Sequence, residues 1–359
     1  MAWFMGAMVA FVGCLLVAIP LLSRRTTPLG VSVPSSRLTD PAVRRGVVGF
    51  QVTAGVLTAI ATAGAVTTAE LNPLLVTTWL IGLIVAGMAA YAWWRRGIIT
   101  AKRAGDWYAH QDVSVSAPIT DPPVVVTWSS LHAVGLAAQV IAAVILALNY
   151  SRLPDPYPTH WGIDGTPDAF AARTPMTVGL VLVIGMVAVV TLWVIALVIA
   201  RRREPVLPDG DPDAARHAGI VVRNRVLLTL ALCSIGSSVL MAFIALVPML
   251  AVSPAMLNVV LWPLTALITL VPVALMVSAA RARLRVGIVH DDGPQSPDDD
   301  RFWKLGMFYY NPDDPSVMIP KRAGVGYDLN YAKPVGWVFA AIAIAAVVFG
   351  LFAPLLFPV

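Results

Sequence analysis

Three side chains that can bind metals or transfer protons lie close together in one short polar segment. The segment 151–175 reads SRLPDPYPTHWGIDGTPDAFAARTP and contains His160, Asp164 and Asp168. An imidazole and two carboxylates can together coordinate a metal ion or act as acid and base at a membrane face. The aspartates also belong to Asp-Gly and Pro-Asp turn sequences, in which a carboxylate caps the backbone. We therefore predict turn-capping carboxylates, with a metal site as the alternative, and no cofactor.

Prolines and glycines make this segment a shaped loop rather than a flexible linker. Gly permits positive φ and Pro fixes its own φ, so the chain direction is defined at several points. Tyr157 and Trp161 are the amphipathic aromatics expected at the level of the lipid headgroups. The candidate ligand-binding residues of the loop are Pro158, His160, Trp161, Asp164, Gly165, Pro167 and Asp168.

A second polar segment, 281–334, carries different groups. It opens with RARLR, which can attract anionic lipid, and continues with DDGPQSPDDD, which we interpret as a solvated acidic linker. Two β-prone runs, 304–310 and 316–319, flank turn residues and predict a small hairpin or irregular module on the inner membrane surface. The candidate residues of this module are Trp303, Lys304, Tyr309, Tyr310, Asn311, Asp313, Asp314, Lys321 and Arg322.

The composition places both segments in a membrane protein. The chain has 359 residues, of which 58% are hydrophobic and 13% charged, with a mean hydropathy of +0.78. A soluble domain carries about 25% charged residues, and fewer cannot cover its surface. These figures exclude a soluble globular enzyme and a disordered chain. The two cysteines, Cys14 and Cys233, lie in apolar runs and offer no disulfide framework.

Eight apolar runs are each long enough to cross a hydrocarbon core of ~30 Å, and none contains Asp, Glu, Lys or Arg. The predicted fold is an all-α integral membrane protein with eight transmembrane helices. In the second run, the spacing of Gly55, Ala59 and Ala63 predicts a tightly packed helix interface. The runs are 2–22, 46–69, 73–94, 125–149, 176–200, 226–250, 256–280 and 335–357.

The basic residues predict the orientation. All of the 25 basic residues except Arg152 and Arg173 fall in loops that alternate spans place on one side of the membrane. The positive-inside rule makes that side cytoplasmic and puts both termini outside. The net charge of +5 is therefore an orientation signal, and nucleic acid is not a predicted partner.

We divide the chain into five regions on this basis. They are an N-terminal three-helix region (1–94), a two-helix unit with the extracytoplasmic loop 151–175 (125–200), a helix pair (226–280), a cytoplasmic linker with the aromatic module (281–334), and the last transmembrane helix (335–357).

Ionisable groups are almost absent from the spans. Ion-coupled transporters place such groups inside the membrane, and here only His132 qualifies. We predict a buried, hydrogen-bonded histidine, and interhelical hydrogen bonds for Gln51 and Gln139. No paired aspartates, Ser–His pair or zinc motif lies within the spans, so the sequence predicts no intramembrane catalysis.

The extracytoplasmic loop resembles an uncharacterised bacterial membrane domain. Its pattern of L-P, then P-x-H-W, then G-x-P-D occurs here as Leu153-Pro154, Pro158-Thr159-His160-Trp161 and Gly165-Thr166-Pro167-Asp168. That domain stands at the front of SdpI-like proteins, which protect a producing cell from a membrane-active peptide. The resemblance covers about 125–200 and implies an immunity function. Gly162 departs from the family, where Asn or Asp is more usual.

The C-terminal segment resembles a second uncharacterised domain, which accompanies the first in bacterial membrane proteins. The similarity rests on W-K-x-G-x-F-Y-Y-N-P-D-D-P and P-K-R-x-G-x-G-x-x-x-N and covers about 301–334. It implies no assigned chemistry.

Three functions remain open at this point. The first is a non-enzymatic protein of the immunity or envelope-sensing type in the bacterial cell membrane, with a peptide or envelope component as partner outside and a regulator protein inside. The second is a transporter or exporter of a hydrophobic or peptide substrate, which the prolines of the sixth and seventh runs would suit. The third is an enzyme at the membrane face that uses His160, Asp164 and Asp168.

Overall fold

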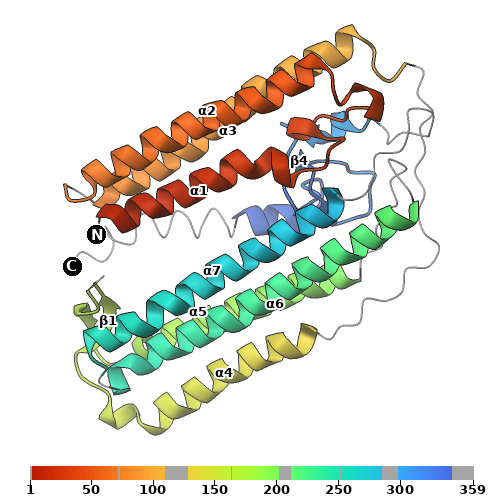
Figure 1. Cartoon of the computed structure of the whole chain (residues 1–359). Helices are drawn as coiled ribbons and strands as arrows, with labels where there is room; N and C mark the ends of the chain where they lie inside the picture. Colours follow the sequence, from red (N-terminus) through yellow and green to blue (C-terminus); the bar gives the residue numbers. More distant parts are fainter. Residues whose placement is uncertain are drawn as a thin grey trace. The chain divides into compact units, whose positions relative to one another are not determined.

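The computed structural model describes residues 2–71, 73–109, 128–162, 164–201, 212–250, 252–284 and 298–341 (Figure 1). These residues form two compact units. Unit 1 comprises the described residues within Met1–Asp121, Arg203–Val222 and Ala279–Leu356, and unit 2 those within Pro122–Arg202 and Arg223–Ser278.

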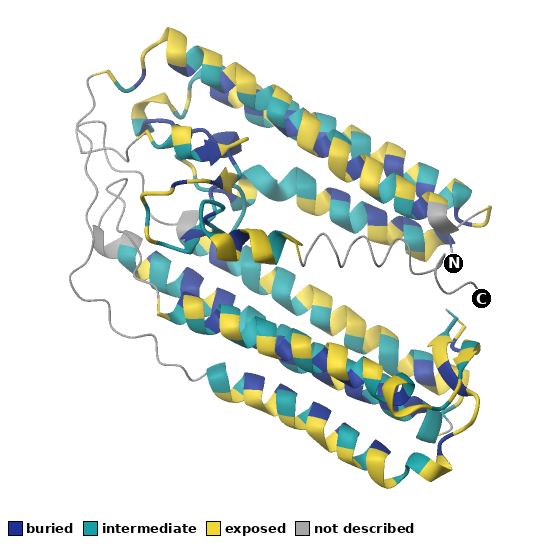
Figure 2. Ribbon diagram, turned by 180° about the vertical axis from the view of Figure 1, so that it is seen from behind, coloured by how far each residue is buried: buried dark blue, intermediate teal, exposed yellow. Residues whose placement is uncertain are grey.

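Seven helices in the described residues are long and apolar enough to cross a membrane. Buried residues recur at helical spacing among half-buried and exposed ones in α1 to α6, whereas the described residues of α7 are buried only at Leu257, Ala279 and Ala280 (Figure 2). The predicted eighth span, 335–357, is helical over 334–341, and its remaining residues lie outside the described part. The helices are α1 (Ala2–Leu22), α2 (Pro41–Thr68), α3 (Pro73–Ala104), α4 (Ser129–Leu148), α5 (Pro175–Ala200), α6 (Pro212–Leu250) and α7 (Pro254–Leu284).

Several helices extend beyond the apolar runs predicted for them. Helix α3 continues from the predicted end at residue 94 to Ala104, and α6 starts before the predicted residue 226. The added turns carry basic residues that were expected in loops, among them the buried Lys102 and Arg223. A helix satisfies its own backbone hydrogen bonds, so the boundary of the apolar run does not end the helix.

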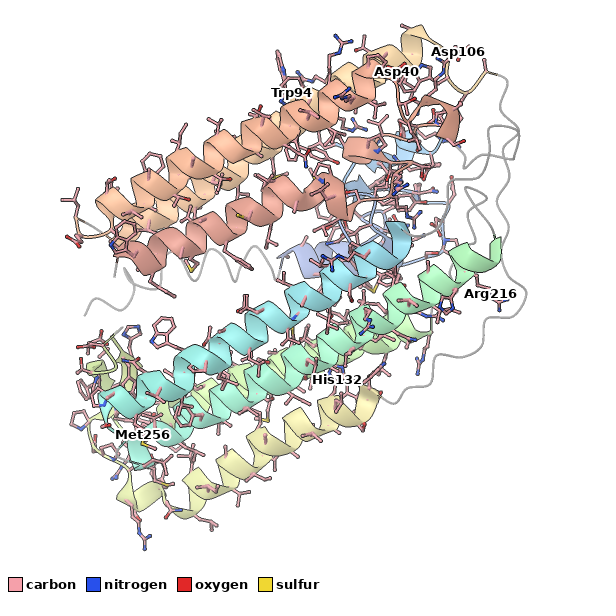
Figure 3. The ribbon with its side chains drawn as sticks, viewed as in Figure 1. Asp40, Trp94, Asp106, His132, Arg216 and Met256 are labelled. Carbon is pink, nitrogen blue, oxygen red and sulfur yellow. The ribbon has the colours of Figure 1, made fainter. Side chains whose placement is uncertain are left out.

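Small residues allow α1, α2 and α3 of unit 1 to pack closely. A Cβ on Gly13 of α1 would lie 2.2 Å from the Thr58 side chain of α2, and a Cβ on Gly64 would lie 2.2 Å from Trp79 of α3. Trp94 of α3 is labelled in Figure 3. Its indole donates a hydrogen bond of 3.1 Å to Thr53 in α2.

The stripe predicted for this contact in α2 was wrong. Ala59 and Ala63 are exposed, and nothing lies within 4 Å of a Cβ placed on Gly55. The buried face consists instead of Phe50, Ala54, Ala61 and Ala65, together with residues nearer the start of the helix. Several small-residue stripes coexist in this Ala- and Thr-rich helix, and sequence spacing alone does not say which of them meets α1 and α3.

The strands of unit 1 pair differently from the sequence prediction. The two β-prone runs do not form one hairpin around 311–315; each run contributes to a separate hairpin. A parallel bridge between Tyr309 and Asn330 links the two hairpins. The first hairpin is β3 (Trp303–Lys304) with β4 (Phe308–Tyr309), and the second is β5 (Met318–Pro320) with β6 (Tyr327–Leu329).

The turn of the first hairpin lies against the loop that follows α1. Gly30 and Gly306 have positive φ angles of 70° and 73°, and a Cβ on Gly30 would lie 2.2 Å from the Gly306 carbonyl oxygen. Two backbones can approach this closely only where neither residue has a side chain. We refer to residues 298–333 as the aromatic module. The loop around Gly30 is buried, and the module packs against it.

Unit 2 contains α4, α5, most of α6 and α7, and one further hairpin. Strand β1 (Tyr157–Trp161) pairs antiparallel with β2 (Pro167–Ala171) in the connection between α4 and α5. Helix α5 begins at Pro175 after Thr174, whose side chain accepts a hydrogen bond from the Thr177 amide. This N-cap ends the connection and sets the direction in which α5 leaves it.

Candidate functional sites

The β1–β2 hairpin holds the candidate ligand-binding residues on a braced support. The Tyr157 hydroxyl donates to the Ala245 carbonyl of α6 at 3.3 Å, and Tyr157 itself is buried. The Arg173 guanidinium donates to the Leu153 carbonyl at 2.6 Å, which closes the base of the hairpin. Tyr157 is therefore an internal anchor and not the headgroup aromatic that we predicted, whereas Trp161 is half-buried.

The hairpin turn is capped by a carboxylate, as predicted. The amide of Thr166 donates to Asp164 at 3.0 Å, and its hydroxyl donates to the same carboxylate at 2.8 Å. The hydrogen bond from the Thr166 amide has the largest effect and lowers the pKa of Asp164, and the hydrogen bond from the Thr166 hydroxyl lowers it further. Gly165 has a φ of 82° and fits against the backbone of Pro254, where a Cβ would lie 2.7 Å from the carbonyl oxygen.

The second aspartate of the hairpin is paired with the histidine. His160 Nδ1 lies 2.5 Å from Asp168 Oδ1, and the two side chains are 65% and 40% exposed. The carboxylate of Asp168 in β2 contacts His160 in β1, so it does not cap a turn. Within the described residues, no group of three His, Cys, Asp or Glu side chains is placed to hold a metal ion.

The hairpin also displays an aromatic side chain that we did not single out. Phe170 is 53% exposed and lies opposite the buried Pro158 in the strand register. Pro167 is exposed as well. The alternation of buried and exposed side chains along a strand could have identified Phe170. The strands are short and their register shifts twice, so the sequence does not show this alternation clearly.

The second candidate site is the aromatic module, and its centre is Asn330, which ends the pattern P-K-R-x-G-x-G-x-x-x-N but was not among the candidate residues. The Asn330 side chain is fully buried. Its oxygen accepts from the amides of Asn311 and Ala332, each at 3.1 Å. Its NH₂ group donates to three carbonyl oxygens, those of Asn311 at 2.8 Å, Ser316 at 3.2 Å and Asp314 at 3.3 Å. One amide group thus joins three segments of the module.

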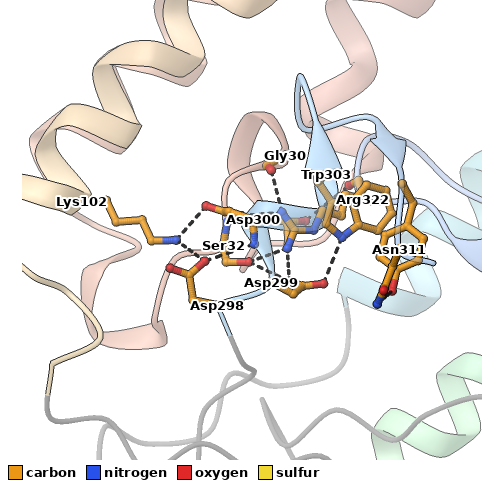
Figure 4. Close-up of polar contacts among 11 residues, drawn as sticks. Gly30, Ser32, Lys102, Asp298, Asp299, Asp300, Trp303, Asn311 and Arg322 are labelled. Atoms are coloured by element: carbon orange, nitrogen blue, oxygen red, sulfur yellow. Dashed lines mark hydrogen bonds and ion pairs between the residues drawn. The ribbon is translucent and has the colours of Figure 1, made fainter. Parts of the chain in front are cut away.

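Acidic and basic side chains attach the module to the rest of unit 1 (Figure 4). The Arg322 side chain is 5% exposed and donates to the Gly30 carbonyl at 2.9 Å and to the Ser32 hydroxyl at 2.8 Å. The same guanidinium pairs with Asp299 and Asp300 and lies over the Trp303 ring, 4.8 Å from its centroid. We name this set the Arg322 cluster.

The helix α3 joins the Arg322 cluster through one lysine. Lys102 Nζ lies 2.7 Å from a carboxylate oxygen of Asp298 and 2.7 Å from one of Asp300. The prediction of a solvated acidic linker was therefore wrong for its last three residues, which are the attachment point of the module. A run of like charges is stable there because two buried cations from other segments neutralise it.

The remaining module residues also have structural roles. Tyr309 accepts from the Asn311 side chain at 3.1 Å and donates to Asp314 at 3.0 Å, and burial, the largest of several effects, raises its pKa to about 12. The Gly324 amide donates to Ser23 at 2.8 Å. Tyr310, Lys304 and Asp313 are exposed, and Lys321 is half-buried.

The charge network predicts that acid loosens the module. Burial, the largest effect, acts to raise the pKa of Asp300, but the Arg322 charge and hydrogen bonds from Lys102 and the Ser32 amide lower it below 3.8. A carboxylate with a lowered pKa stabilises the fold above its unfolded pKa, and this contribution is lost as the pH falls through the folded value. Protease cleavage of the module should therefore increase below about pH 4. Asp300→Asn should reduce this dependence, while the exposed Asp313→Asn should leave it unchanged; equal profiles for both variants would contradict the assignment.

Comparison with known proteins identifies two short domains, one at each candidate site. Residues 139–185 match a domain of unknown function, DUF1648, which is known from SdpI-like proteins. Residues 312–337 match a family of unknown function, DUF5808. No curated protein and no solved structure matches the chain. The first match contains the whole β1–β2 hairpin, and the second contains Arg322 and Asn330.

Proposed function

We propose that the chain is a non-enzymatic multi-pass protein of the bacterial cell membrane, of the immunity or envelope-sensing type. The observation that carries the proposal is the braced hairpin, which presents His160, Asp168 and Phe170 to solvent within the segment that matches DUF1648. Seven apolar helices support a lipid bilayer as its environment.

The hairpin suits a peptide or envelope ligand on the extracytoplasmic side. Its base is held by Tyr157 and Arg173, so its exposed residues are displayed with little loss of conformational entropy on binding. His160 and Asp168 offer hydrogen bonds, and Phe170 offers an aromatic contact.

The aromatic module would face the cytoplasm and bind a regulator protein. The positive-inside rule supports this side, because the module lies in one of the loops that together carry all the Arg and Lys residues except Arg152 and Arg173. Its exposed residues include Leu305, Phe308 and Tyr310, which a partner could contact. Arg322 at the centre of the Arg322 cluster is buried and bonded to other residues of unit 1.

Removing the exposed polar pair tests this function. In cells that lack the gene, wild-type protein should restore tolerance of, or a transcriptional response to, an added membrane-active peptide. The variant His160→Gln with Asp168→Asn should respond about tenfold more weakly, as expected for the loss of about 1.4 kcal/mol of binding. Dose–response curves measure this shift.

The matched control is Thr159→Ala, which changes an exposed residue of the same strand. It should respond as the wild type does, with equal amounts of protein in the membrane. A deletion strain with unchanged sensitivity and no transcriptional response would refute the immunity or sensing function.

A transporter or exporter is the second candidate, and one observation favours it. Four polar side chains, His132, Gln139, Ser234 and Ser238, are fully buried in unit 2. A polar interior can accommodate a passing solute, which a uniformly apolar bundle cannot. Uptake or efflux measured in reconstituted vesicles distinguishes this candidate from a sensor.

A further inference from the structure

Four polar side chains on α4 and α6 form a continuous buried set in unit 2. His132 and Gln139 lie on the buried face of α4, with Gly135 between them. Ser234 and Ser238 are four residues apart on α6 and are also fully buried. We name His132, Gln139, Ser234 and Ser238 the polar seam.

The two helices meet at Gly135. A Cβ on this glycine would lie 3.3 Å from the Ser234 carbonyl oxygen and 3.3 Å from Ser238 Oγ. One turn further along, Gln139 Nε2 donates to the Ser238 carbonyl at 3.0 Å. Gln139, Ser234 and Ser238 therefore lie at one contact between the two helices, and His132 lies on the same buried face of α4, about one turn before Gly135.

Most polar atoms of the seam have no partner in the protein. Among the described residues, both ring nitrogens of His132, Gln139 Oε1, Ser234 Oγ and Ser238 Oγ are buried and accept or donate no hydrogen bond. The neighbouring Ser237 behaves differently, because its hydroxyl donates to the Ser234 carbonyl at 3.2 Å, as helical serines commonly do. Thr62 Oγ1, Tyr91 Oη and Arg95 Nε of unit 1 are also buried without a partner in the described protein, but they belong to separate side chains, whereas the seam brings five such atoms to the facing sides of two helices.

Unpaired polar groups are costly at membrane depth, where lipid offers no hydrogen bonds. Five such atoms on the facing sides of α4 and α6 need a ligand that both donates and accepts. A small, mostly apolar cavity borders the seam at His132 alone, with Ser129 and Leu227 among its other lining residues, and has room for about one water molecule. Water is the smallest ligand with the required chemistry, and buried waters typically make about three hydrogen bonds.

We infer that the polar seam is an internal hydration site, in which ordered water molecules bridge His132, Gln139, Ser234 and Ser238. His132 lies one turn from the start of α4 and Gln139 lies near its middle, about 10 Å further along the helix axis. The site therefore carries polar contacts from one end of the helix to its midpoint. It is independent of any ligand at the β1–β2 hairpin.

Water-edited solid-state NMR on the full chain in lipid vesicles tests the site. Magnetisation should pass from water to the imidazole nitrogens of His132, which His132→Asn identifies by the loss of their signal. Gly135→Ala, which pushes into the seam, and the pair Ser234→Ala with Ser238→Ala should reduce the transfer. The transfer itself is measured on the wild-type protein, so only the assignment of the signal depends on the His132→Asn variant.

Two matched controls separate hydration from general damage. Ser237→Ala removes a hydroxyl that already has a partner, and Gly179→Ala adds a methyl group where nothing lies within 4 Å. Both should leave the transfer unchanged. Absence of transfer to His132 in the wild type would overturn the inference, as would transfer that the seam variants do not alter. If Ser234→Ala and Ser238→Ala each raised the Tm, the hydroxyls would have no hydrogen-bond partner in the wild type, and the inference would also be overturned.

Discussion

Arg322→Leu is expected to loosen the aromatic module from the rest of unit 1, because it removes the hydrogen bonds to Gly30 and Ser32 together with the ion pairs to Asp299 and Asp300 inside the module. The guanidinium is 5% exposed and pairs with two aspartates, so its removal leaves Asp299 and Asp300 beside each other without their main counter-charge. Breaking a buried ion pair costs about 3–5 kcal/mol, and the lower end applies because Asp299 is 39% exposed. Thermal unfolding and limited proteolysis of purified protein should show a lower Tm and faster cleavage within 298–333.

Arg301→Leu is the matched control for this change. Arg301 is exposed, and its guanidinium lies over the Phe302 ring at 4.5 Å; its backbone carbonyl accepts from Lys304, a bond that the substitution keeps while it removes the same charge. It should change the Tm little. Arg322→Lys should be intermediate, because one ammonium cannot reproduce the planar fork that reaches Gly30, Ser32 and both carboxylates. Equal effects of Arg301→Leu and Arg322→Leu would show that net charge, and not the cluster, holds the module.

Asn330→Ala should unfold the module from its centre. The substitution leaves two backbone amides and three carbonyl oxygens without their partner in a buried place. A single buried unsatisfied group costs about 1–3 kcal/mol, so the combined loss should be at least about 3 kcal/mol. Hydrogen exchange of the module amides should rise towards that of an unfolded segment, while exchange in the helices of unit 2 remains slow.

Asn330→Asp separates the hydrogen bonds that Asn330 accepts from those that it donates. An aspartate keeps the oxygen that accepts from Asn311 and Ala332, but it replaces the NH₂ donor with an oxygen that faces three carbonyl oxygens. It should therefore destabilise the module nearly as much as alanine does. The exposed Asp313→Ala serves as the control and should have no effect. A stable module with Asn330→Asp would mean that the donated hydrogen bonds contribute little.

The two candidate sites share one design. In each, a few residues with defined hydrogen bonds fix an irregular segment to apolar helices: Tyr157 and Arg173 at the hairpin, Arg322 and Asn330 in the module. Each site lies within, or partly within, a segment that matches a domain of unknown function.

Predictions that rest on apolar patterning agree with the structure. Seven of the eight predicted runs are helices suited to a membrane, and residues 334–341 begin the eighth. Gln139 and Gln51 form the predicted interhelical hydrogen bonds, to Ser238 at 3.0 Å and Val17 at 3.5 Å. His132 is buried as predicted but has no hydrogen-bond partner in the described protein.

Two predictions failed because they depended on which distant segment supplies the partner. The aspartates at 298–300 looked like a solvated linker because Lys102 and Arg322, which neutralise them, lie far away in the sequence. The β-prone runs could not be paired correctly, since short strands carry too little pattern to select their neighbours.

The sequence by itself determined that the chain is a multi-pass membrane protein, because burial in lipid is a property of composition that each apolar run displays on its own. It also determined the turn at Asp164, where the capping groups lie two residues apart. Only the tertiary structure decided which charges are buried, which small residues form helix contacts and which polar groups form the seam. Those properties depend on pairs of residues that the chain brings together, and no local pattern encodes them.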